Sequence, residues 1–241
     1  MKKVFIIIFF LVLIISIGII SLPKIWALHF IKSRYSENET PWAYIVPVDR
    51  TVSSSIVNLS DYQSFTCDNL KFNVPWKDLK QKEERKTFIF LSFHSADNKG
   101  IYMNRGKVTE FRISERLLGE DPSDAKKLKE LIGEQTFKSD YSVFVESLGT
   151  TPDQASIFRS SGELGKAIVM LMLKRAFTEP NIEKIYKFET EVIRGIQFGD
   201  PQEINPVAIK ISNKDGKIHR MSIHSANQEE IDFILSSMII L

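Results

Sequence analysis

Residues 207–224 read VAIKISNKDGKIHRMSIH, and this stretch decides what kind of sheet the chain can form. In residues 207–212, valine and isoleucine alternate with alanine, lysine and serine, which is the pattern of a strand with one buried face. The NKDG sequence at residues 213–216 has turn composition and leads into a second strand at residues 217–224. Two strands joined by so short a turn run antiparallel, so the sequence predicts an antiparallel sheet.

Strand patterns also precede this hairpin along the chain. Residues 64–67 and 70–74 are predicted to pair around the two-residue turn between them. Residues 184–198 are predicted to form one long strand, with Gly195 as a bulge or bend. The mixed-charge run KQKEERK at residues 80–86 is expected to be an exposed turn. Further strands are expected at residues 87–93, 101–103 and 108–113.

Helical patterns are grouped in the middle and at the end of the chain. Capping-box sequences at residues 151–154, 160–163 and 225–228 predict helix starts, because the side chains at their two ends satisfy exposed backbone N–H groups. Long alternating units of strand and helix are absent from the sequence, so the domain is predicted to be α+β, with a mostly antiparallel sheet packed with helices. Helices are expected at residues 122–132, 140–148 and 164–177, and from the last capping box to Met238.

Two short stretches resemble a known domain family. Residues 70–76 read LKFNVPW, which resembles the opening strand of PsbP-like α/β/α sandwich domains, where a phenylalanine, x, x-proline, tryptophan stretch leaves the first hairpin. Residues 233–237 (FILSS) are similar to the closing helix of such domains. The resemblance covers about a tenth of the chain and implies an architecture only, because these folds serve unrelated binding and assembly roles.

Residues 4–22 (VFIIIFFLVLIISIGIISL) form an apolar run without an ionisable side chain. As a helix that rises about 1.5 Å per residue, the run is close to the roughly 30 Å thickness of the hydrocarbon core of a bilayer. We therefore expect residues 1–23 to be a transmembrane signal-anchor that contacts the lipid bilayer through residues 4–22. Residues 24–41 are then a juxtamembrane linker and residues 42–241 an extracytoplasmic α+β domain, so the predicted fold class includes one N-terminal transmembrane helix.

The fate and the orientation of this apolar run are separate questions. A signal peptide cleaved after Ala27 is the alternative to an anchor, but the apolar region of such a peptide is only about 7–15 residues long. Trp26 suits the membrane–water interface beside a retained anchor. Basic residues stand on both sides of the run, so the positive-inside bias is nearly balanced. We expect a single-pass protein of the cell membrane with its large C-terminal domain outside the cytoplasm.

The distribution of charge bounds the classes of partner. The chain has 32 Lys and Arg residues and 30 Asp and Glu residues. Five of the basic residues and two of the acidic ones lie in residues 1–40, which leaves 27 against 28 in the remainder. The domain therefore has no excess of positive charge for a nucleic acid, and we exclude that class of partner. The sole cysteine, Cys67, is expected to be a small buried residue.

The histidines are the residues from which a site could be built. The sequence SFHSADN at residues 92–98 resembles SIHSANQ at residues 222–228, and in each the histidine stands at the end of a predicted strand. One hypothesis is that His94 and His224 face one another at a shared sheet edge and form a ligand-binding site. The alternative is that both are ordinary strand endings. His219 and His224 are five residues apart and so lie on opposite faces of a strand, which argues against a metal site.

We expect a membrane-anchored extracytoplasmic binding or assembly domain of the cell envelope. It would bind a protein partner, with no cofactor, no metal and no catalysis, because the sequence lacks the common catalytic and phosphate-binding motifs. One alternative is an immunity-type inhibitor of a toxin. Another is a divergent hydrolase that uses His94 or His224 with a nearby carboxylate. A third is a carrier with an apolar cavity beside Met170.

Overall fold

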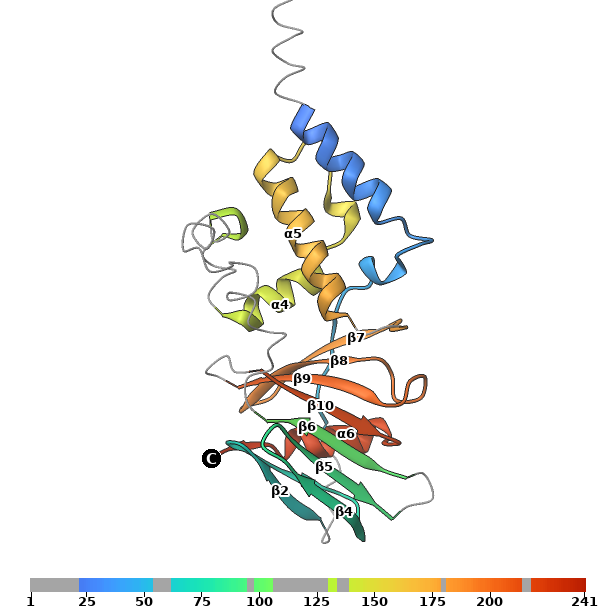
Figure 1. Ribbon diagram of the computed structural model, residues 1–241, viewed down its shortest axis with the longest axis vertical. Coiled ribbons are helices and arrows are strands. Elements are labelled where there is room, and N and C mark those ends of the chain that lie inside the picture. Colours follow the sequence, from blue (N-terminus) through green and yellow to red (C-terminus); the bar gives the residue numbers. More distant parts are fainter. Residues whose placement is uncertain are drawn as a thin grey trace, which may run out of the picture.

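An eight-stranded sheet forms the centre of the structure (Figure 1). The computed structural model describes residues 22–53, 62–94, 98–105, 130–133, 139–178, 181–213 and 218–241. The strands of this large sheet are β1 (Val48–Asp49), β4 (Leu79–Glu84), β5 (Phe88–Phe93), β6 (Gly100–Asn104), β7 (Ile185–Glu189), β8 (Ile193–Phe198), β9 (Val207–Asn213) and β10 (Ile218–His224).

The pairing of these strands confirms the α+β fold with a mostly antiparallel sheet. The order is β1-β7-β8-β9-β10-β6-β5-β4, and only the pair β1–β7 is parallel. The predicted hairpin is confirmed as β9 and β10, with Ile209 opposite Met221. A smaller sheet has the order β11-β3-β2. Its strands are β2 (Gln63–Cys67), β3 (Leu70–Val74) and β11 (Ile239–Ile240), and β2 and β3 form the second predicted hairpin.

One face of the large sheet packs against the smaller sheet and a C-terminal helix, α6 (Gln228–Ser236). The apolar stripe expected on this helix is confirmed, because Ile231, Ile234, Leu235 and Met238 are all buried. Cys67 is also fully buried, as expected. The other residues at the centre of this core include Phe72, Leu91, Phe93, Ile101, Met103, Ile209 and Met221.

Two helices, α4 (Asp140–Gly149) and α5 (Ser161–Phe177), cover the opposite face of β7–β10 (Figure 1). The predicted start of α5 is confirmed, since Ser160 and Glu163 form a reciprocal capping box. This helix is buried on the side that faces the sheet, whereas Met172 is 58% exposed. The core between these helices and the sheet includes Phe144, Leu148, Met170, Phe177, Ile196 and Phe198.

A third layer lies outside α5. Residues 22–34 form a helix, drawn in blue at the top of Figure 1, and Ile31 packs with Tyr35 and Leu171 in a buried cluster. Residues 24–41, expected to be a juxtamembrane linker, are therefore largely helical and in contact with α5. The cluster also buries Ala43 in the 3-10 helix η1 (Pro41–Ala43).

Several local predictions were wrong. Residues 184–198 form the hairpin of β7 and β8, not one strand. Gly195 makes no bulge there; it leaves room for the ring of Phe188, because an added Cβ would lie 2.5 Å from Cζ of that ring. The expected turn at residues 80–86 mostly belongs to β4, at an edge of the large sheet. The capping box of α6 begins at Asn227 instead of Ser225.

Three predictions concern residues outside the described ranges. They are the transmembrane run, apart from Leu22, the strand at residues 108–113, and most of the helix at residues 122–132. Among the described residues, none of the helices has the length and apolar character needed to cross a bilayer.

Candidate functional site

The two predicted site histidines lie at the same end of the large sheet. His224 on β10 is opposite Gly100 on β6, and Gly100 is opposite Ser92 on β5, two residues before His94. One strand therefore separates the strands that carry the histidines. His94 is exposed, whereas His224 is half-buried and burial lowers its pKa. Because no contact joins them among the described residues, a shared site of His94 and His224 stays a prediction.

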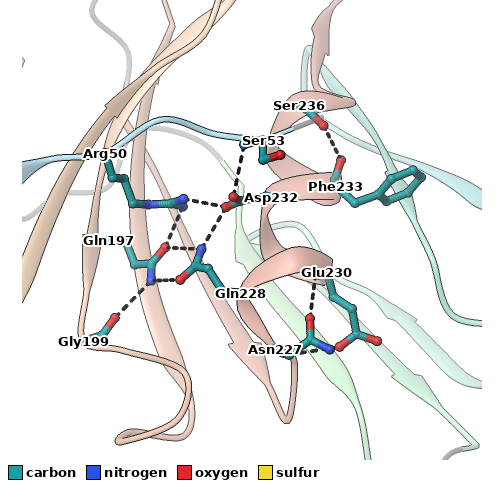
Figure 2. Close-up of polar contacts among 10 residues, drawn as sticks. All are labelled: Arg50, Ser53, Gln197, Gly199, Asn227, Gln228, Glu230, Asp232, Phe233 and Ser236. Carbon is teal, nitrogen blue, oxygen red and sulfur yellow. Dashed lines mark hydrogen bonds and ion pairs between the residues drawn. The ribbon is translucent and has the colours of Figure 1, made fainter. Parts of the chain in front are cut away.

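The most extensive buried polar network joins three distant segments (Figure 2). Arg50, just after β1, donates one hydrogen bond of 2.5 Å to Asp232 on α6 and one of 2.7 Å to Gln197 on β8. Gln228 donates to the same oxygen of Asp232 at 2.8 Å, and the backbone N–H of Ser53 donates to the other oxygen at 3.1 Å.

This network has the properties of a structural clamp. The side chains of Arg50 and Asp232 are only 12% and 8% exposed, so their charges are removed from water and neutralise each other. Both carboxylate oxygens already accept hydrogen bonds, as Figure 2 shows. The amide of Gln197 is held between Gly199 and Gln228. The network therefore fixes α6 and residues 50–53 against β8.

Two buried lysines have a similar role on the other side of the sheet. Lys174 on α5 is fully buried and donates to the carbonyls of Ala43 at 2.9 Å and Thr150 at 2.8 Å. Burial lowers the pKa of Lys174 to about 8. Lys210 on β9 donates to the carbonyl of Phe177 at 2.6 Å and lies 4.6 Å from the ring centre of Phe198. The ammonium group of Lys174 thus ties η1 and the end of α4 to α5, and that of Lys210 ties the end of α5 to the large sheet.

A groove beside α4 is the best candidate for a binding site. It consists of a pocket of about 540 Å³ and a pocket of about 210 Å³, which share Glu146, Thr150 and Gln154 in their linings. Tyr141 and Arg194 line the larger pocket. Lys166 lines the smaller one and forms an ion pair of 2.8 Å with Glu146. We call these two adjoining pockets the α4 groove.

Two residues that line the larger pocket carry buried polar atoms without a partner in the described part of the chain. Tyr141 is only 5% exposed, and its hydroxyl makes no hydrogen bond within the described part of the chain. Burial raises the pKa of Tyr141 to about 12, although the charge of Arg194 acts in the opposite direction. The guanidinium carbon of Arg194 lies 4.4 Å from the centre of the Tyr141 ring, and its buried Nε likewise has no partner there.

These groups determine what the α4 groove can bind. A buried donor without a partner destabilises the free protein by about 1–3 kcal/mol, and a ligand with a suitable acceptor removes that penalty. The phenol of Tyr141 and the guanidinium of Arg194 both donate, so a carboxylate or carbonyl oxygen is the complementary group.

No sequence motif marks this groove. Tyr141 lies in α4 and Arg194 in β8, and the two meet only because α4 packs across the sheet. No protein-family model matches the chain, and no curated protein matches it at a significant level. The functional argument therefore rests on the geometry of the groove and on the sequence.

Proposed function

We propose that this chain is a membrane-anchored extracytoplasmic binding domain of the cell envelope, and that it holds a protein partner in the α4 groove. The binding proposal is carried by two buried polar groups, those of Tyr141 and Arg194, which have no partner among the described residues and belong to the lining of a pocket of about 540 Å³. The apolar run at residues 4–22 supports the anchor.

The chemistry of the groove favours binding over catalysis. The strong buried charges of the described structure serve as structural ties, as the pair Arg50–Asp232 and the ammonium group of Lys174 illustrate. In the groove itself, Glu146 is paired with Lys166. The partner is then an extended polypeptide segment that presents an acidic side chain or a backbone carbonyl to Tyr141 and Arg194.

Site-specific photo-crosslinking in the producing cell tests the binding site. A crosslinking residue at Ser142, which lines the groove, should capture one dominant partner. The same residue at Gln81, which is exposed on β4, should not capture it. Tyr141→Phe should weaken the crosslink from position 142 while the protein level is unchanged. Equal capture from both positions, or a crosslink that is insensitive to Tyr141→Phe, would exclude the α4 groove as the binding site.

A reporter fusion tests the location independently. An enzyme that is active only outside the cytoplasm, fused after Leu241, should be active in intact cells. An inactive reporter on a stable fusion protein would reverse the proposed topology and leave the groove untouched.

A further inference from the structure

An apolar turn is exposed at one end of the molecule. In the turn from Ser156 to Arg159, the backbone N–H of Arg159 donates to the carbonyl of Ser156 at 3.1 Å. Phe158 at its tip is 94% exposed and Ile157 is 51% exposed. Single exposed apolar residues are common on protein surfaces, but a phenylalanine almost wholly in water beside an exposed isoleucine indicates a surface that is covered in use.

The turn leads directly into the capped start of α5. Ser160 caps the helix, and the carboxylate of Glu163 accepts a hydrogen bond of 2.7 Å from the backbone N–H of Ser160. Arg159 forms an ion pair of 2.9 Å with Glu163. These hydrogen bonds lower the pKa of Glu163 to about 2, so its carboxylate stays charged and the cap stays formed at neutral pH.

The turn lies at the same end as the first residues of the described chain. The helix of residues 22–34 runs beside α5, with Ile31 against Leu171. Tyr35 follows Ile31 by one turn, and Arg175 follows Leu171 by one turn. Burial raises the pKa of the Tyr35 phenol, and the nearby guanidinium of Arg175 acts in the opposite direction. The two helices thus run in the same direction, which brings the start of residues 22–34 to the end of α5 that carries the turn (Figure 1).

This end of the molecule is apolar on both elements. Leu22, Ile25 and Trp26 are 62%, 50% and 64% exposed. Lys24 in the helix is basic, whereas Arg159 at the end of the turn is paired with Glu163. Surfaces that enter the interfacial region of a bilayer with anionic headgroups combine apolar and aromatic side chains with basic ones.

We infer that Ile157 and Phe158 insert into the interfacial region of the bilayer that residues 4–22 are proposed to cross. This inference rests on the membrane anchor of the proposed function. The bilayer is the occupant because the apolar run of the sequence ends at Leu22, the residue with which the described helix begins. The turn is then a second membrane contact, which fixes the tilt of the domain and the direction in which the α4 groove faces.

A fluorescent label in the full-length chain, reconstituted in vesicles that contain anionic lipid, tests this contact. The label is an environment-sensitive fluorophore on Phe158→Cys, and Cys67 does not compete because it is fully buried. A matched control carries the label on Gln81→Cys in β4, which lies at the opposite end of the molecule (Figure 1). We expect the label at position 158 to emit at shorter wavelength than the label at position 81. Lipids with a nitroxide on the acyl chain should quench the emission at position 158.

Each result separates the two proposals. Suppose that the protein resists alkaline extraction from the vesicles but that the labels at positions 158 and 81 emit at the same wavelength. That result would overturn the membrane contact of the turn and leave the anchor intact. A short-wavelength emission without lipid quenching would show that a protein surface covers Phe158, and would also overturn it. Protein that alkaline extraction removes from the vesicles would overturn the anchor and the contact together.

Discussion

Arg50 and Asp232 form an ion pair of 2.5 Å although 182 residues separate them in the sequence. The pair joins the segment after β1 to the C-terminal helix α6. Since each charge is buried with the other, removal of one partner leaves an uncompensated charge.

We therefore predict that Arg50→Met lowers the free energy of unfolding by about 3–5 kcal/mol. The control is Lys187→Met, which removes the pair that Lys187 forms with Asp49 at 3.2 Å. Asp49 is 86% exposed in that pair, so its loss should change stability by less than about 1 kcal/mol. Urea unfolding of the detergent-solubilised chain measures both values. Equal effects of the two substitutions would show that the Arg50–Asp232 pair contributes little.

Lys174 makes stability depend on pH. Its pKa is about 8 in the folded chain and near 10.5 in the unfolded chain. Between these values the unfolded chain holds a proton that the folded chain has released, so stability rises with pH. Below pH 8 the lysine is protonated in both states, and stability no longer changes with pH through this group. From about pH 7 to about pH 9.5 this lysine should add about 2 kcal/mol. Lys174→Met should lack that increase, and the same increase in the variant would assign it to other groups.

Substitution of Tyr141 should have different effects on stability and on binding. The buried hydroxyl of Tyr141 has no hydrogen bond to any described residue, so Tyr141→Phe should leave the free energy of unfolding unchanged or raise it by about 1 kcal/mol. The same substitution should weaken binding of the partner in the α4 groove. Urea unfolding and the crosslinking yield from position 142 measure the two effects. A loss of more than about 1 kcal/mol of stability would show that the hydroxyl has a structural role instead.

Gly195 is required by the close approach of its neighbours. A Cβ at this position would lie 2.5 Å from Cζ of Phe188 and 2.7 Å from the carbonyl oxygen of Lys210. Gly195→Ala should therefore destabilise the fold by about 1–3 kcal/mol. Gly162→Ala is the control, because the nearest atom there, the hydroxyl of Ser160, would lie at 4.0 Å. Thermal unfolding of the two variants should separate them clearly, and a shared midpoint would contradict the packing argument.

Elements whose signals are local could be predicted from the sequence. The hairpin of β9 and β10 follows from alternation and a turn of polar residues and glycine, and the start of α5 follows from the capping box of Ser160 and Glu163. The turn between β7 and β8 was missed because it has no Gly, Pro or Asn. The hydroxyl of Thr190 holds it instead, by accepting hydrogen bonds from the backbone N–H groups of Val192 and Ile193.

The candidate site could not be predicted in the same way. Tyr141 and Arg194 belong to elements that meet only in the folded protein, and neither stands in a sequence motif. The choice between Ser225 and Asn227 as the cap of α6 shows the same limit. Ser225 has a positive φ of 55° and bonds to Asn205, a partner that the local pattern does not reveal.

The outermost strand, β4, has the sequence LKQKEE, and most of its side chains are exposed. An open sheet edge offers unpaired backbone groups to any neighbouring strand, and charged side chains on that edge discourage such pairing. The two lysines and two glutamates of β4 would therefore prevent a second copy of the chain from pairing with this edge.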